Sequence, residues 1–157
     1  MQRLRIWASV CAVVLGLALG ARADCSNPQT IKELRDCWQE SWKQKDLTAL
    51  LSLYSDNASL LTGDGSVDGI VKIKAYLQTK INLNTQFVFT TVSHIEPSEY
   101  GYDSGTFQQT IPQSQPQDGS YLLVAQKGAK GRLRIIQHAF VTKRSAPVTA
   151  PCVTCFL

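Results

Sequence analysis

The hydrophobic pattern of this chain changes once, near Thr85, and this change constrains the fold more than any other feature. Before Thr85, apolar residues recur three and four positions apart, which is the spacing of one helical face. After it, Phe, Val and Thr dominate extended segments of the kind that form strands. Helices followed by strands predict an α+β fold, in which the helices pack on one face of a curved, mainly antiparallel sheet.

The elements can be placed along the chain from this pattern. Three helices are predicted over residues 29–45, 46–56 and 69–81, with a short strand over 58–62. Four long strands follow over residues 86–96, 100–110, 121–127 and 132–143, with a Pro- and Gln-rich loop over 111–120. Arg35 belongs to the polar faces of the first helix. Tyr54 closes an apolar pattern that begins at Leu47, so we assign it to the second helix.

Residues 1–23 have the features of a signal peptide. Two arginines precede an apolar stretch, and Ala21-Arg22-Ala23 supplies a small-x-small cleavage pattern. Cleavage would leave a domain over residues 24–145 and a cysteine-containing tail over 146–157, in a secreted or periplasmic protein with no membrane segment. Without the three arginines of the signal the net charge falls from +4 to +1. A near-neutral chain lacks the electrostatic surface that binds nucleic acid.

Export changes how the remaining cysteines are interpreted. Cys25, Cys37, Cys152 and Cys155 form an even set, which predicts disulfides in an oxidising compartment and allows three pairings. The favoured arrangement joins Cys25 and Cys37 to the tail cysteines and so ties the two ends of the domain together. Cys152-x-x-Cys155 also has the spacing of a redox motif or half a zinc site, but no second ligand pair accompanies it. No metal and no cofactor are predicted.

Several local strings, in their order and spacing, resemble the nuclear transport factor 2-like superfamily, and most of all its SnoaL-like branch. They are Trp38-x-x-x-Trp42, Leu53 to Ala58, Gly69, Asp103 to Phe107, Gly119 to Val124 and Gly131 to His138. The resemblance covers nearly all of residues 29–143. It implies a cone-shaped domain whose curved sheet and helices enclose an apolar pocket, and a homodimer formed through the back of the sheet.

The resemblance does not carry a reaction with it, because this fold hosts many functions. Aligned on the ketosteroid isomerase of the superfamily, the proton-shuttling Asp falls on Thr62. The two groups that stabilise the oxyanion fall on Trp38 and Leu123. None of these side chains can replace a carboxylate base or an acidic O–H donor. The alignment therefore predicts that isomerase chemistry by that mechanism is absent.

His138 is the best remaining candidate for catalysis. The alignment places Ile136, His138 and Phe140 on the concave side of the sheet, where a histidine could act as acid or base near pH 6.5. Asp103, on a neighbouring predicted strand, could orient it. The alternatives are a core histidine hydrogen-bonded to a backbone or Tyr partner, and an exposed Asp103 near a strand bulge.

Eight residues are predicted to line the pocket: Trp38, Trp42, Tyr54, Thr62, Tyr121, Leu123, Ile136 and Phe140. The competing interpretation of the aromatic ones is core packing. Three functions follow, with binding of a small apolar molecule without catalysis favoured over an isomerase, cyclase or dehydratase that uses His138, and over a dimeric assembly module. An open cavity with His138 and a carboxylate within hydrogen-bond reach would support the enzyme. A cavity filled by Trp38, Trp42 and Phe140 would support assembly.

Overall fold

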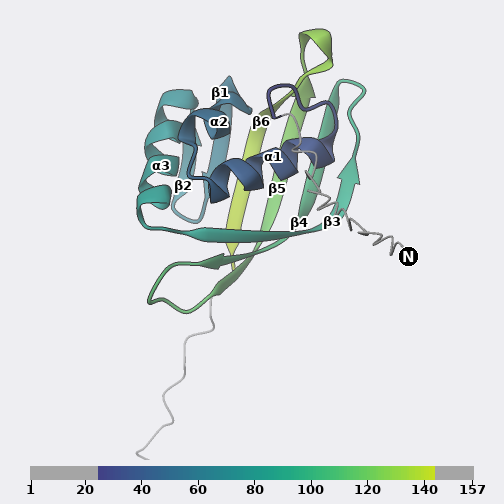
Figure 1. The fold of residues 1–157 in the computed structure, drawn as a ribbon. Helices are drawn as coiled ribbons and strands as arrows, with labels where there is room; N and C mark the ends of the chain where they lie inside the picture. The colour runs from purple at the N-terminus through teal and green to yellow at the C-terminus, as the bar shows by residue number, and fades with distance from the viewer. Residues whose placement is uncertain (1–24, 144–157) are drawn as a thin grey trace, which may run out of the picture.

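A six-stranded sheet and three helices make up the described part of the chain (Figure 1). The structure is a computed structural model, and it describes residues 25–143. The elements are α1 (Ile31–Lys43), α2 (Leu47–Ser52), β1 (Tyr54–Thr62), β2 (Gly65–Asp68), α3 (Ile70–Asn82), β3 (Gln86–Ile95), β4 (Tyr100–Thr110), β5 (Gln117–Lys127), a 3₁₀ turn (Ala129–Gly131) and β6 (Leu133–Thr142).

The strands lie in the order β2-β1-β6-β5-β4-β3. All neighbours are antiparallel except β1 and β6, which pair in parallel. The helices cover one face of the curved sheet: α1 lies across it, and α3 lies toward its β1 and β2 side (Figure 1). The predicted α+β class, with three helices on a curved and mainly antiparallel sheet, is confirmed.

The first helix begins where the sequence supplies a capping box. The Thr30 side chain accepts from the backbone N–H of Glu33, and the Glu33 carboxylate accepts from the backbone N–H of Thr30. Glu96, the residue after β3, accepts from the N–H of Ile31 at 2.9 Å. Local and long-range contacts therefore hold the start of α1 against the sheet, and α1 supplies the helical wall of the candidate site.

The second helix is shorter than predicted, and Tyr54 belongs to a strand. Asp46 caps α2 as expected, but the helix ends at Ser52. Tyr54 pairs with Ile135 of β6, and the N–H of Ile135 donates to the carbonyl of Leu53 at 2.8 Å. Pairing with a strand about 80 residues away overrides the local helical pattern. The prediction also missed β2 and began β5 too late, since the strand already starts at Gln117.

A β-bulge in β6 corrects the prediction for Ile136. Val124 pairs with Gln137, but the next residue, Ala125, pairs with Ile135, so Ile136 is an extra residue in β6. The bulge reverses the alternation of side chains along the strand. Ile135 is consequently fully buried, whereas Ile136 is only partly buried and does not line the cavity beside His138.

A disulfide joins Cys25 to Cys37 of α1, with their Cα atoms 5.3 Å apart. The favoured expectation, in which both residues bond to the tail, is therefore wrong. The disulfide closes a short loop of the chain, with a sequence separation of 12. It holds the segment before α1 against that helix and does not join the two ends of the domain. Cys152, Cys155, the proposed signal peptide and the tail lie outside the described residues. Within residues 25–143 no helix is long and apolar enough to cross a membrane.

Candidate functional site

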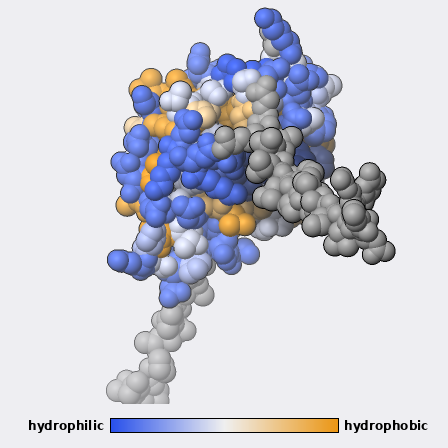
Figure 2. All heavy atoms as spheres, viewed as in Figure 1, coloured by the Kyte–Doolittle hydropathy of each residue, from blue (hydrophilic) through white to orange (hydrophobic). Residues whose placement is uncertain are grey.

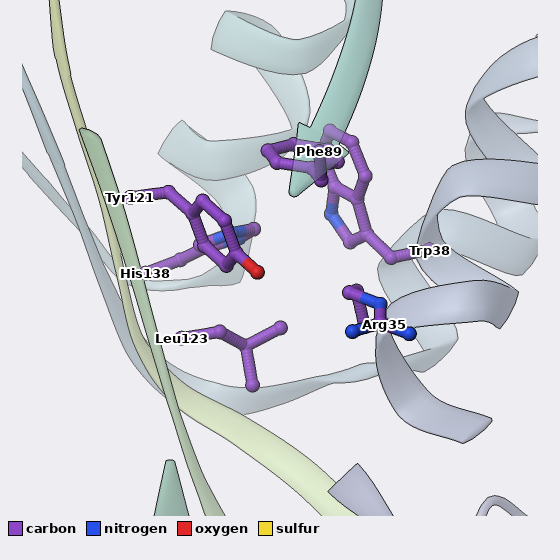
Figure 3. A pocket seen from close by; sticks show the side chains of 6 residues that line it. All are labelled: Arg35, Trp38, Phe89, Tyr121, Leu123 and His138. Carbon is purple, nitrogen blue, oxygen red and sulfur yellow. The ribbon is translucent and has the colours of Figure 1, made fainter. Parts of the chain in front are cut away.

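The candidate site is a small cavity between α1 and the concave face of the sheet (Figure 3). Six residues line it: Arg35 and Trp38 from α1, Phe89 from β3, Tyr121 and Leu123 from β5, and His138 from β6. The space open to the centre of a water molecule is about 10 Å³. That is room for about one water, far less than the few hundred Å³ of an ordinary ligand pocket.

The sheet register places Asp103, Leu123 and His138 in one row across β4, β5 and β6. Opposed residues in antiparallel strands have Cα atoms about 5 Å apart. Because Leu123 lies between Asp103 and His138, the Cα atoms of those two residues are about 10 Å apart. No hydrogen bond joins Asp103 to His138; each has other partners among residues 25–143. The structure therefore does not form the Asp103–His138 pair that was considered from the sequence.

His138 is buried in a hydrogen-bonded chain with two aromatic side chains. Trp38 donates its indole N–H to the Tyr54 hydroxyl oxygen at 2.9 Å, and the same hydroxyl lies 2.8 Å from His138 Nδ1. Burial lowers the pKa of His138 to about 3. The imidazole is thus neutral at physiological pH, and the Tyr54 hydroxyl can donate to Nδ1. This arrangement matches the core histidine with a Tyr partner, and it is poorly suited to proton transfer near pH 6.5.

The rest of the cone interior is filled by aromatic rings. Trp38 stacks on Trp42 with ring centroids 5.1 Å apart, and Trp42 donates its indole N–H to the carbonyl of Thr85 at 2.8 Å. The other rings packed into this cluster are Phe87, Phe89, Phe107, Tyr121 and Phe140. Such edge-to-face and offset contacts add to the burial of a large apolar area. This cluster occupies the space where the resemblance implied a pocket.

A second polar group, the Arg35 cluster, lies at the edge of the cavity and comprises Arg35, Thr91, Asp103 and Tyr121. Arg35 Nη1 lies 3.3 Å from Asp103 Oδ2, and it also donates to the Thr91 hydroxyl. Thr91 in turn contacts Asp103 at 3.3 Å and the Tyr121 hydroxyl at 3.1 Å. The Asp103 carboxylate is fully buried, and its Oδ1 has no hydrogen-bond partner among residues 25–143. Arg35 therefore supplies the charge that Asp103 needs to stay buried.

The pKa shifts of Arg35 and Tyr121 agree with a charged arginine and a neutral tyrosine in this cluster. Burial acts to lower the pKa of Arg35, but the carboxylates of Asp36 and Asp103 outweigh it and leave the pKa raised. Burial also raises the pKa of Tyr121, so its hydroxyl stays protonated. In Figure 3 that hydroxyl points into the space between the sheet and α1. The cluster is thus an ion pair between Arg35 and Asp103 with two hydroxyl groups beside it.

The predicted pocket residues divide into three groups. Trp38, Tyr121 and Leu123 line the cavity. Trp42, Tyr54 and Phe140 are buried in the core around it. Thr62 and Ile136 do not line this cavity. Thr62 is buried at the turn between β1 and β2, where it donates to the carbonyl of Gly65 at 3.1 Å and accepts from the N–H of Asp64.

Sequence reasoning missed Arg35 and Phe89. The alternation of Phe87 and Phe89 in the predicted strand was a signal for Phe89, but nothing local marks Arg35, whose partner is 68 residues away. His94, the second histidine, is exposed on β3. In the described part of the chain no three His, Cys, Asp or Glu side chains gather closely enough to hold a metal ion.

Small curved-sheet α+β domains of this architecture are known among solved structures. A ketosteroid isomerase-like protein from Erwinia carotovora atroseptica is similar at a TM-score of 0.64 and 11% identity, over 73% of this chain and 95% of the other. A nuclear transport factor 2-like protein from Salmonella enterica gives 0.64 and 17%, over 76% and 92%. A putative calcium/calmodulin dependent protein kinase II association domain from Xanthomonas campestris gives 0.65 and 17%, over 74% and 87%.

The chain therefore has the nuclear transport factor 2-like fold, as its sequence strings implied. Other similar structures are described as cystatin-like folds of unknown function. No family model matches the sequence, and no curated protein matches it. Identities this low show the fold alone, so function must be argued from the residues of this chain.

Proposed function

We propose that this chain is an exported, non-catalytic assembly module that forms a homodimer through the outer face of its sheet. The single observation that carries the proposal is the filled interior, whose cavity near His138 has room for about one water. With the concave side closed by Trp38, Trp42 and Phe140, the surface left for function is the opposite side of the same sheet.

The outer face has the composition of a protein contact surface. Across β4, β5, β6 and β1, three neighbouring rows of the sheet register carry no charged side chain: Tyr102–Val124–Gln137–Ser59, Ser104–Leu122–Ala139–Leu61 and Thr106–Ser120–Val141. The charge at their margin is Asp68 on β2, which pairs with Ser59. Leu61, Leu122 and Val141 are between 36% and 52% exposed. Depletion of charge at the centre is what distinguishes interfaces from the remaining surface. The opposite, helical side is mainly hydrophilic, with apolar patches toward α3 (Figure 2).

The similar solved structures agree with this proposal, although the proposal does not depend on them. Two of the similar structures are described as putative calcium/calmodulin dependent protein kinase II association domains. Those words apply to those proteins. The same architecture therefore carries the description of an association domain elsewhere, which supports a role that needs no open pocket.

The test is the oligomeric state of the mature chain from Asp24, measured by sedimentation or light scattering across a concentration series. We expect a dimer. Val141→Lys should weaken it at least about tenfold, because burying an unpaired lysine costs more than about 1.4 kcal/mol. The matched control is Val71→Lys on α3, where the side chain is 79% exposed and lies away from the sheet face. A wild type that stays monomeric, or equal effects of the two lysines, would refute the proposal.

A small apolar ligand, held in the cone without catalysis, is the second candidate. It is supported by the apolar lining and by Arg35, a partly exposed side chain that could move aside and enlarge the cavity. Indole and benzene can be titrated against the wild type and Leu123→Ala while the melting temperature is followed. The assembly proposal expects a response only from Leu123→Ala, whose new cavity can hold such a molecule. A saturable response of the wild type would favour the ligand.

Export is the part of the proposal that depends on residues 1–23. The disulfide between Cys25 and Cys37 supports it, because such bonds persist in oxidising compartments. Expression of the full chain with its N-terminus intact, followed by mass measurement of the exported product, tests it. We expect a product that begins at Asp24. An unprocessed chain retained in the cell would contradict this step and leave the dimer test unaffected.

A further inference from the structure

A groove on the outer face of the sheet begins where the described chain ends. It has about 340 Å³ of space open to the centres of water molecules. Its walls are two adjacent rows of the sheet register, and the side chains that line it are Val88 and Thr90 of β3, Thr106 and Gln108 of β4, Asp118 of β5, and Lys143. Lys143 follows β6 directly, and its N–H donates to the carbonyl of Asp118 at 2.8 Å.

Phe107 of β4 and Gly119 of β5 complete the lining of the groove. They pair with each other in the sheet register, and Gly119 shares the inward parity of Tyr121 and Leu123, so the walls of the groove are the outward side chains on either side of them. Two of these wall residues are threonines, and Val88 is 64% exposed. The groove therefore crosses the strands from β6 toward β3 as a band of uncharged side chains, with charges only at the Asp118 and Lys143 end.

The chain that continues beyond Lys143 matches this surface. Residues 145–157 contain no charged side chain, and most are Ala, Pro, Val, Thr or Cys. Crossing from β6 to β3 requires about 14 Å, three strand spacings, which about five extended residues can cover. Pro147 and Pro151 favour extended backbone, which suits a segment laid across a groove.

We propose that residues 145–157 lie in this groove and cover the edge of the outer face in the same molecule. The segment would bury Val88 and the threonine row and would lie beside Val141, the last apolar residue of the third uncharged row. A regulatory consequence follows, and it rests on the proposed dimer. The docked tail and the second copy of the chain would compete for the outer face of the sheet, so the tail must be released before the dimer forms.

Disulfide trapping on the full mature chain tests the position of the tail. Val88→Cys places a thiol in the groove, and Val71→Cys places one on α3 at a site that is at least as exposed. Each variant is equilibrated in a glutathione redox buffer, and bonds to Cys152 or Cys155 are identified by mass spectrometry. We expect at least about tenfold more tail-linked product from Val88→Cys than from Val71→Cys, within one molecule, because docking raises the effective concentration of the tail thiols. Equal yields from the two variants, or bonds formed only between molecules, would overturn the proposal.

Deletion of residues 145–157 separates this proposal from the dimer. If both are right, the deletion lowers the dimer dissociation constant at least about threefold. Specific trapping by Val88→Cys without any dimer supports the docked tail and refutes the proposed function. A dimer that deletion leaves unchanged, together with unspecific trapping, refutes the docked tail and keeps the proposed function.

Discussion

The two faces of the sheet are built from the same strands but have opposite properties. Along β5, Tyr121 and Leu123 point into the aromatic interior, and Leu122 and Val124, which alternate with them, point outward. The inward residues are almost fully buried and the outward ones are not. Because strand side chains alternate, a single stretch of sequence determines both a core and a surface.

The difference shows where stability and function reside in this molecule. On the concave face, Tyr54 pairs with His138 and Arg35 pairs with Asp103, and the rings leave room for about one water. The outer face has exposed apolar side chains, and its three central rows carry no charge across β4, β5, β6 and β1. We therefore expect substitutions on the concave face to change folding stability, and those on the outer face to change association.

The largest expected effect is the loss of the central ring of the concave face. Trp38→Ala should lower the free energy of unfolding by about 3–5 kcal/mol, because the indole is buried, stacked on Trp42 and bonded to Tyr54. Val141→Ala, on the outer face, should change it by less than about 0.5 kcal/mol in the monomer. Urea unfolding followed by circular dichroism measures both. Similar losses from the two substitutions would remove the contrast between the faces.

The Arg35 cluster should give the next largest effect. Arg35→Met leaves the buried Asp103 carboxylate without its cation, which should cost about 3 kcal/mol of unfolding free energy. The double variant Arg35→Met/Asp103→Asn should recover a part of that loss, because it removes the unpaired charge as well. Lys32→Met is the control, since the Lys32–Asp36 pair is exposed and worth little. Additive effects of the two substitutions would contradict a charge-specific coupling.

The sequence predicted the fold class because both periodicities are local. Trp38 and Trp42 share a helical face, and Tyr121 and Leu123 share a strand face, so their inward direction could be predicted without the structure. Each of these predictions depends only on neighbours within a few residues. The same holds for the capping residue Asp46, whose side chain bonds three residues ahead.

The errors arise where distant segments decide the outcome. Ile136 is a bulge only because β6 must match the register of β5 on one side and of β1 on the other. The burial of Asp103 depends on Arg35, which local periodicity assigns to a polar helix face. The pairing of Cys25 with Cys37 is one of three that four cysteines allow, and only the geometry of the folded chain chooses among them.

Between pH 7.5 and 4.5, the smallest of these effects is the pH dependence contributed by His138, and it tests whether the concave face excludes water. Its pKa is about 3 in the folded chain and about 6.5 when unfolded, so the unfolded state binds the proton first as the pH falls. The stability that His138 contributes is complete above about pH 6.5. It should be lost toward pH 3 at up to about 1.4 kcal/mol per pH unit.

Urea unfolding at intervals from pH 7.5 to 4.5 measures this slope. His138→Gln should flatten it, whereas His94→Gln, which removes an exposed side chain, should leave it unchanged. A wild-type slope equal to that of His138→Gln would mean that His138 titrates normally, and the concave face would then be open to water.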